Sequence, residues 1–388
     1  MPFALPHIVA GFIAVMVGYT SSVILIIQAA TAAGADAAQV ASWLWTLGIG
    51  MGSSCIGLSL YYRIPVLTAW STPGAALLIT SLGDFSLAEA IGAFIISSLL
   101  ITLCGISGWF DRLMRHIPAP LAAAMLAGVL LRFGLDLFKV APQDPLLLGS
   151  LLLAFLLGRH LWPRYTMVLV LMSGIAICAL RGELQLGGVH WQLATPVWIS
   201  PTFSLDALLG IALPLFIVTM TSQNIPGITI LRAHGYQPAT SSLISWTGLT
   251  GLLLAPFGGY AFNLAAITAA ICMGKEVDPD ANRRWPAAVW AGSFYLLTGC
   301  FGATVAALFT AFPATLITCV AGLALLGTIG SSLHTALQQD EAREAALLTF
   351  IITASGISLL GVGAACWGLL VGFGLHLIQS RPRGRAKQ

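Results

Sequence analysis

The chain is built almost entirely from apolar stretches long enough to cross a membrane. The run "IGAFIISSLLITLCGISGW" (91–109) holds no charged residue, and similar runs recur along all 388 residues. A helix needs roughly 20 apolar residues to cross the hydrocarbon core of a bilayer. Only 8% of the residues are charged, whereas a soluble domain carries about 25%. These features predict a protein that folds in lipid and has no sizeable soluble domain.

Short polar stretches divide the chain into fourteen predicted membrane-spanning segments. They are 8–30, 42–61, 64–82, 87–110, 118–138, 145–161, 164–181, 204–224, 238–256, 258–274, 285–309, 313–333, 344–360 and 363–379. Of the 17 Lys and Arg residues, all but Arg132, Lys139 and Arg181 then fall on one side of the membrane. Positive residues accumulate on the cytoplasmic side, so we expect both termini in the cytoplasm.

The two halves of the chain resemble each other. The stretch "IPAPLAAAMLAGVLL" (117–131) matches "FPATLITCVAGLALL" (312–326), and Ser42-Trp43 matches Ser245-Trp246 at a similar offset. Each half holds seven predicted segments. Because seven is odd, the second half must enter the membrane from the opposite side. Inverted repeats of this kind are typical of secondary transporters.

The third and tenth segments carry helix-breaking residues at their centres. In "PVLTAWSTPGAALLIT" (65–80), β-forming residues precede Thr72, which offers a capping hydroxyl, and Pro73, which suits a first helical turn. In "APFGGYAFNLAAITAAI" (255–271), a glycine pair precedes Asn263, a good helix N-cap. We therefore expect each of these segments to be extended for half its length and helical for the rest.

Such a pair of segments can form an anion site. Inverted topology turns the two half-helices so that their N-termini face each other near mid-membrane. Helix N-termini present unpaired N–H groups and a partial positive charge, which bind anions without a charged side chain. Extended backbone survives in lipid only where it is buried in protein or lines a cavity. The alternative is a pair of proline-kinked segments that form no site.

Several of these stretches resemble one family. "VLTAWSTPGAALL", "VTMTSQNIPGI", "AAITAAIC" and "LAAAMLAGVLLRFG" look like the BenE family of benzoate transporters, which belongs to the uracil/xanthine-permease-like group with seven-plus-seven inverted repeats. The resemblance covers essentially the whole chain. It implies an all-α polytopic protein of the bacterial inner membrane, assembled as a homodimer, that imports benzoate together with protons.

The same resemblance implies two structural domains. A core domain would comprise 1–116 and 201–311, and a gate domain would comprise 117–200 and 312–388. Elevator-type movement of the core against the gate would carry the substrate across the membrane.

The sequence departs from the related nucleobase permeases at one point. Those permeases carry carboxylates on the eighth and tenth segments, whereas the matching stretches here are Ser222-Gln223-Asn224 and Phe262-Asn263. A carboxylate would repel an aromatic carboxylate, and neutral amides would not. The departure favours benzoate over a nucleobase, and it removes the usual candidates for the proton carrier.

We predict a substrate site formed by polar and aromatic residues of the first, third, eighth and tenth segments. The residues are Tyr19, Ser71, Thr72, Gln223, Asn224, Tyr260, Phe262, Asn263 and Leu264. Gln223 and Asn224 are placed near the cytoplasmic end of the eighth segment, where their amides could instead bond a neighbouring backbone. Asn263 could be a cap alone, and the aromatic residues could be ordinary packing.

The charged residues near segment ends have simple structural explanations. Ser86 and Glu89 fit a capping box at the start of the fourth segment, and Asp206 complements a helix dipole. Arg132 and Asp136 are four residues apart and can pair on one helix face. Arg132 could alternatively attract anions at an outer vestibule.

Other classes of protein find less support. No HExxH or GxSxG motif occurs, and no CxxC pair suggests a metal site. We therefore expect no enzyme, cofactor or metal, and the basic tail "RPRGRAKQ" indicates topology rather than a nucleic-acid partner. The alternatives that remain are a nucleobase or inorganic-anion transporter of the same fold, and an anion channel.

Overall fold

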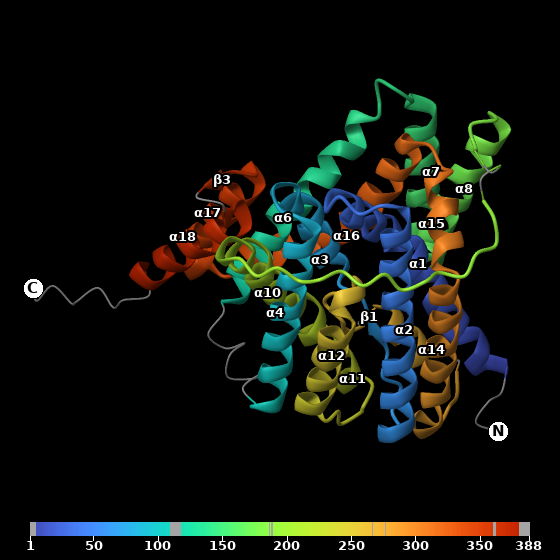
Figure 1. The fold of residues 1–388 in the computed structure, drawn as a ribbon, viewed down its shortest axis with the longest axis horizontal. Coiled ribbons are helices and arrows are strands. Elements are labelled where there is room, and N and C mark those ends of the chain that lie inside the picture. Colours follow the sequence, from blue (N-terminus) through green and yellow to red (C-terminus); the bar gives the residue numbers. More distant parts are fainter. Residues whose placement is uncertain are drawn as a thin grey trace, which may run out of the picture.

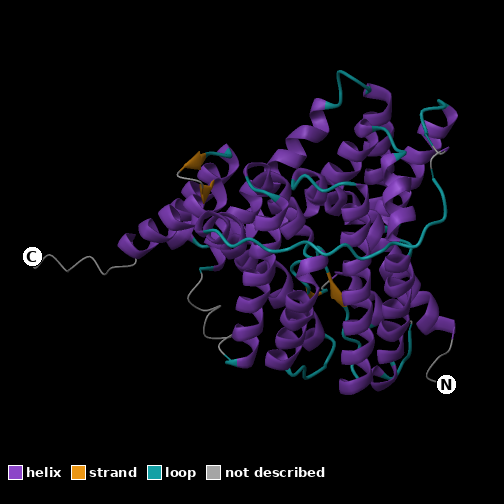
Figure 2. Ribbon diagram, viewed as in Figure 1, coloured by secondary structure: helices purple, strands orange, loops and turns teal. Residues whose placement is uncertain are grey.

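The computed structural model describes residues 5–108, 118–185, 187, 189–265, 267–275, 277–359 and 362–379. Most of this part of the chain is helical. Figure 1 shows the helices packed side by side, and Figure 2 shows two short ribbons of strand, one of them near the centre of the molecule. The central ribbon is the feature that positions the site.

The first half of the chain runs from α1 to α8. Its helices and strand are α1 (Leu5–Ala32), α2 (Ala37–Tyr62), β1 (Thr68–Ala69), α3 (Thr72–Ser81), α4 (Leu87–Ile106), α6 (Ala119–Lys139), α7 (Pro145–Leu161) and α8 (Thr166–Leu180). Short 3-10 turns lie at Leu82–Asp84 and Pro163–Tyr165.

The second half runs from α9 to α18. Its elements are α9 (Leu205–Ala207), α10 (Leu213–Thr219), α11 (Ile225–Ala233), α12 (Thr240–Leu254), β2 (Asn263–Leu264), α13 (Ile267–Cys272), α14 (Trp285–Cys300), α15 (Gly302–Thr310), α16 (Ala314–Leu337), α17 (Arg343–Ser355), β3 (Ser358–Leu359), β4 (Val362–Gly363) and α18 (Ala364–Gln379). Two π-helical turns, Leu208–Ala212 and Met220–Asn224, join α9, α10 and α11 into one continuous helix. The remaining 3-10 turns are Ala255–Phe257, Ala281–Arg283 and Asp340–Ala342.

Several helices match the dimensions of a bilayer. Among the described residues, 5 helices are long and apolar enough to cross a membrane, and the number rises to 7 if each of two bent pairs counts as one span. One of those pairs is α14 with α15, which meet at an angle of 70°. Shorter apolar helices such as α7 and α8 accompany them. The structure supports a helical membrane protein, and the count of fourteen segments stays a prediction.

Helices from opposite halves of the chain pack closely. The most extensive contacts join α2 with α14, α4 with α12, and α6 with α16. The glycines of "GIGMGSSCIG" permit the first contact: a Cβ atom on Gly48 would lie 2.4 Å from Gly299 Cα, and one on Gly52 would lie 2.7 Å from Gly292 O. These glycines are therefore helix-packing positions.

The two half-extended segments meet as predicted. β1 and β2 form an antiparallel pair in which Thr68 lies opposite Leu264 and Ala69 opposite Asn263. Side chains of α2 hold β1 in place: Thr68 Oγ1 lies 2.6 Å from Ser54 Oγ and donates to Met51 O at 3.1 Å. Because the strands are antiparallel, the helices that follow them, α3 and α13, start at opposite ends of the ribbon and run in opposite directions.

The structure corrects three local predictions. The N-cap of α3 is Ser71, whose hydroxyl accepts from Gly74 N at 3.0 Å, and Thr72 is the first helical residue. Asn263 is not an N-cap, because it lies in β2, four residues before α13 begins. Gln223 and Asn224 do not lie near a helix end, because the π-helical turn lets the helix continue past Pro226 to Ala233. Pro226 lacks a backbone N–H to bond within the helix, and the π turn before it accommodates this missing bond.

An extended strap, 189–204, connects the halves (the yellow-green segment crossing the front of Figure 1). Its backbone N–H groups donate to several different elements. Ala194 N donates to Cys300 O at 2.8 Å, Ile199 N to Pro256 O at 2.8 Å and Thr202 N to Ala88 O at 2.9 Å. Val197 N donates to Ser42 Oγ at 2.9 Å. The strap thus ties the ends of α2, α4, α12 and α14 together.

Candidate substrate-binding site

A cavity of about 930 Å³ lies at the central ribbon. One wall comes from α1, the β1–α3 connection, the π turn at Met220–Asn224, α13 and α14. The other comes from the first turns of α6 and α8 and the last turns of α16. Cavities that bind small molecules usually measure roughly 300 to 1,000 Å³. The size and the central position make this cavity the candidate site.

Neutral polar side chains face this cavity without partners in the described part of the chain. No hydrogen bond to a described residue involves the side chains of Thr72, Ser222, Gln223, Thr268, Thr328 or Ser332, all of which line the cavity. Hydroxyl and amide groups donate hydrogen bonds to carboxylate oxygens. Ser332 is buried and the other five are partly exposed, so these groups can bond a polar ligand or bound water in the cavity.

Aromatic rings supply the apolar part of the wall. Trp70 and Tyr295 line the cavity. Trp70 is fixed from behind, because its Nε1 donates to Ser22 Oγ at 2.8 Å and the ring of Tyr19 packs edge-on against it with centroids 4.9 Å apart. Tyr19 itself does not reach the cavity among the described contacts, so it supports the wall rather than forming it.

The side chains of Asn224 and Asn263 form hydrogen bonds with the backbone at the β1–β2 ribbon. Asn224 is fully buried, and its Oδ1 accepts from Leu264 N at 3.0 Å, which is the backbone role that the sequence left open. Asn263 is also fully buried, and its Nδ2 donates to Ala261 O at 2.9 Å. Neither residue is among those that line the cavity. Their amides hold the extended backbone, which cannot satisfy its own hydrogen bonds.

The remaining predicted site residues lie behind the cavity wall. Tyr260 is fully buried against Trp43 and Phe94, with ring centroids 5.8 and 5.3 Å apart. Phe262 packs on Gly50 of α2, where an added Cβ would approach its ring to 2.3 Å. Of the nine predicted residues, Thr72 and Gln223 line the cavity. Ser71 is the N-cap of α3 and thereby positions Thr72.

No charged side chain lines the cavity among the described residues. Every Asp and Glu in the described ranges is at least partly exposed. Glu89 completes the predicted capping box with Ser86, and Asp206 lies in the first turn of α9. Arg132 pairs with Asp136 at 3.8 Å as predicted. A ligand in this cavity would therefore meet dipoles and rings rather than full charges.

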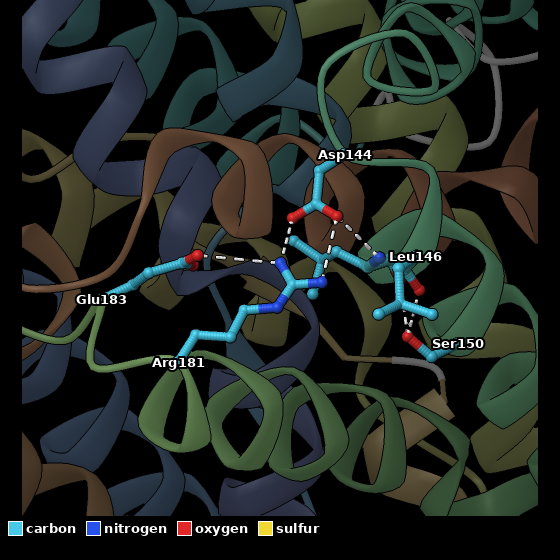
Figure 3. A network of polar contacts seen from close by, with 6 residues as sticks. Asp144, Leu146, Ser150, Arg181 and Glu183 are labelled. Carbon is cyan, nitrogen blue, oxygen red and sulfur yellow. Dashed lines mark hydrogen bonds and ion pairs between the residues drawn. The ribbon is translucent and has the colours of Figure 1, made fainter.

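A second, open cavity of about 580 Å³ lies where α7, α8 and α16 end or begin. Figure 3 shows the ion pair at its edge: Arg181 donates to both carboxylate oxygens of Asp144, at 2.5 and 3.3 Å, and lies 3.7 Å from Glu183. Asp144 also caps α7 by accepting from Leu147 N at 2.9 Å. All three charged groups satisfy one another, so this cluster has a structural role.

The sequence analysis missed the contribution of α16. Thr328, Ser331, Ser332 and Thr335 line the cavity from this helix. Their spacing of three, one and three residues puts them on one face of a helix, and this pattern is visible in the sequence. Trp70 was also missed, although it lies within the quoted stretch that precedes Ser71.

Two solved structures share the fold of this chain. The structure of SLC26A9 aligns with a TM-score of 0.58 and 14% identity, covering 96% of this chain and 65% of that longer chain. The transmembrane domain of the cyanobacterial bicarbonate transporter BicA aligns with a TM-score of 0.55 and 11% identity, covering 97% of this chain and 96% of that one. The chain therefore has the same fold as these two structures.

The sequence comparisons identify the family. The family model described as benzoate membrane transport protein matches residues 1–378. The benzoate membrane transport protein of Acinetobacter baylyi is 39% identical over 381 residues, which cover 98% of this chain and 97% of that protein. Inner membrane protein YdcO of Escherichia coli K12 is 50% identical over 382 residues, with 97% and 98% covered. The chain belongs to the benzoate membrane transport family, which is a family of transport proteins and not of enzymes.

Proposed function

We propose that this protein carries benzoate, or a similar aromatic carboxylate, across the bacterial inner membrane. The observation that carries the proposal is the cavity, which combines unpartnered hydroxyl and amide groups with aromatic rings and lacks described charged side chains. A relative 39% identical is named a benzoate membrane transport protein, and one 50% identical is named an inner membrane protein. These names agree with the chemistry of the cavity.

The polar groups of the cavity suit the carboxylate of benzoate, and its aromatic side chains suit the ring. The carboxylate would meet the first turn of α3 at Thr72 and the amide of Gln223, and both groups line the cavity. The ring would lie against Trp70 and Tyr295, because aromatic rings favour stacked or edge-on contacts. Gln223 can donate through its amide without bringing a negative charge near the carboxylate.

We propose further that the proton crosses on the substrate. No described acidic residue lines the cavity, and Glu89 and Asp206 lie at helix starts, where they complement the helix dipoles. Removing a carboxylate from water disfavours its charged form and so favours protonation of the bound substrate. Benzoate and a proton would then move together without a carboxylate of the protein as the carrier.

Movement of a core domain against a gate domain would expose the cavity to each side in turn. The proposed core is 1–116 with 201–311, and the proposed gate is 117–200 with 312–388. The strap bears on the boundary of this division, because Ala194, Val197 and Ile199 fall within the proposed gate range yet bond α14, α2 and the turn after α12, which belong to the proposed core. The cavity lies where helices of both groups meet. The homodimer and the cytoplasmic termini remain predictions.

Direct binding tests the proposed substrate. The purified protein in detergent is titrated with benzoate, uracil, sulfate and bicarbonate, and binding is measured by calorimetry. We expect benzoate to bind and the other three to bind at least tenfold more weakly. Preferential binding of uracil or of an inorganic anion would contradict the proposal and favour another transporter of this fold.

A further inference from the structure

One face of α16 carries four hydroxyl residues that line the cavity. Thr328, Ser331, Ser332 and Thr335 follow the i, i+3, i+4, i+7 pattern of a single helix face. The neighbouring Ile329 points elsewhere, against α6, where its Cδ1 lies 3.2 Å from the position of a Cβ on Gly134. The hydroxyl face is therefore distinct from the face that packs α16 into the protein.

The four hydroxyls do not behave alike. Ser331 Oγ donates to Thr328 O at 3.1 Å and Thr335 Oγ1 donates to Ser331 O at 3.0 Å. Hydroxyl groups in membrane helices commonly bond their own backbone in this way. In contrast, Thr328 and Ser332 make no side-chain hydrogen bond to a described residue. Ser332 is only 7% exposed, and the cavity is what it faces.

An unbonded hydroxyl keeps its capacity to donate and to accept hydrogen bonds; Ser332 is buried and Thr328 is partly exposed. Thr328 and Ser332 differ from the other two in leaving this bonding capacity free, in a cavity whose opposite wall holds the free groups of Thr72 and Gln223. A carboxylate has two oxygens, each of which can accept hydrogen bonds from hydroxyl and amide donors.

Resting on the proposed function, we propose that Thr328 and Ser332 form a second contact for the carboxyl group of benzoate, on the wall opposite Thr72 and Gln223. The contact belongs to the state described here, in which the cavity reaches the last turns of α16 and the first turns of α6 and α8. When the proposed core moves, Thr72 and Gln223 travel with the substrate while α16 stays behind. Thr328 and Ser332 therefore contact the carboxyl group at the end of the cavity where the substrate leaves the protein.

The positive-inside pattern places this end on the cytoplasmic side. Thr328→Cys and Ser332→Cys are labelled in membrane vesicles of both orientations with a membrane-impermeant thiol reagent, and the wild-type chain gives the background from native cysteines. Both variants should react from the cytoplasmic face, and saturating benzoate should slow the reaction at least threefold. Thr318→Cys, on the same helix but outside the cavity lining, should show no protection by benzoate.

Exchange kinetics give the second readout. The double variant Thr328→Val with Ser332→Ala removes both hydroxyls with little change in volume, and it should slow benzoate exchange about five- to tenfold, whereas Thr318→Val should exchange at the wild-type rate. Wild-type exchange by the double variant, or labelling that benzoate does not slow, would overturn the α16 contact while leaving benzoate transport intact. Wild-type protein that exchanges no benzoate would instead overturn the proposed function, and the carboxyl contact with it.

Discussion

Two amide residues of the predicted site, Gln223 and Asn263, have different surroundings in the structure. Gln223 faces the cavity with a free amide, whereas Asn263 is fully buried in the ribbon and its Oδ1 has no described partner. The sequence could not separate them, because both are amides beside a break in a helix. Gln223 lies in a π turn and Asn263 lies in a paired strand, and the local sequence shows neither feature.

This difference predicts that replacing the amide by a carboxylate impairs substrate binding at Gln223 and folding at Asn263. Gln223→Glu adds a negative charge near the substrate carboxylate, and like charges about 5 Å apart repel by about 3 kcal/mol at an effective dielectric of 20. Benzoate binding at neutral pH should therefore fall at least tenfold while the protein still folds. Binding should recover in acid as Glu becomes protonated.

Asn263→Asp is the matched control. It would bury an unpaired charge in the ribbon, which destabilises folding strongly. We expect this variant to lose its folded, monodisperse form in detergent size-exclusion chromatography. If Asn263→Asp folds normally and loses binding, while Gln223→Glu binds normally, the cavity assignment is wrong.

At the scale of elements, the start of α3 combines a structural and a binding group in adjacent residues. Ser71 caps the helix, and Thr72 faces the cavity. Ser71→Ala removes the cap and should lower stability by about 1 kcal/mol. Thr72→Val should leave the melting temperature close to wild type and weaken benzoate binding. Thermal melts and titrations on the two variants check this separation, and equal effects of both variants on stability and binding would contradict it.

The Asp144–Arg181 pair joins the start of α7 to the end of α8 (Figure 3). The hydrogen bond from the Arg181 guanidinium holds the pKa of the Asp144 carboxyl below its usual range. A carboxylate with a lowered folded-state pKa stabilises the fold above its unfolded pKa of about 3.9, and this contribution is lost as pH falls through the folded value.

Asp144→Asn should therefore remove part of the acid sensitivity of the protein. Melting temperatures measured between pH 3 and pH 7 should show the variant less stable than wild type near neutral pH, with the difference shrinking below about pH 4. A difference that stays constant across this range would show that the pair contributes nothing through its charge.

The sequence predicted the elements that carry local signals. The break at residues 71–74 and the capping box at Ser86 and Glu89 both depend on neighbouring residues, and the structure confirms them. The exact cap of α3 and the role of Asn263 were wrong. These depend on where the two halves of the chain pair, which no local pattern encodes.

The site residues divide in the same way: some carry a local signal in the sequence, and others depend on how distant parts of the chain pack. Thr72 and Gln223 were found because they flank helix breaks. Tyr260 and Phe262 were included for their ring chemistry, yet they pack against Phe94 and Gly50 behind the wall. Ring type alone does not show which way a side chain points. Periodicity on the helix at residues 314–337 would have found the hydroxyl face.

At the scale of the whole molecule, the placement of acidic residues bears on proton coupling. If the proton crosses on benzoate, neither Glu89→Gln nor Asp206→Asn should abolish benzoate accumulation driven by a pH gradient in proteoliposomes. Each should retain at least half of the wild-type accumulation. A variant that still exchanges benzoate but no longer accumulates it would identify that side chain as the proton carrier.

The central claim is that the protein moves benzoate by exposing the central cavity to each side of the membrane in turn, and counterflow tests it most directly. Proteoliposomes loaded with unlabelled benzoate are diluted into a trace of labelled benzoate without a pH gradient. A carrier should take up the label transiently against its concentration gradient, faster than liposomes loaded with sulfate do. If internal benzoate gives no such acceleration although labelled benzoate crosses, the protein is a channel, and if no label enters, it is not a benzoate transporter.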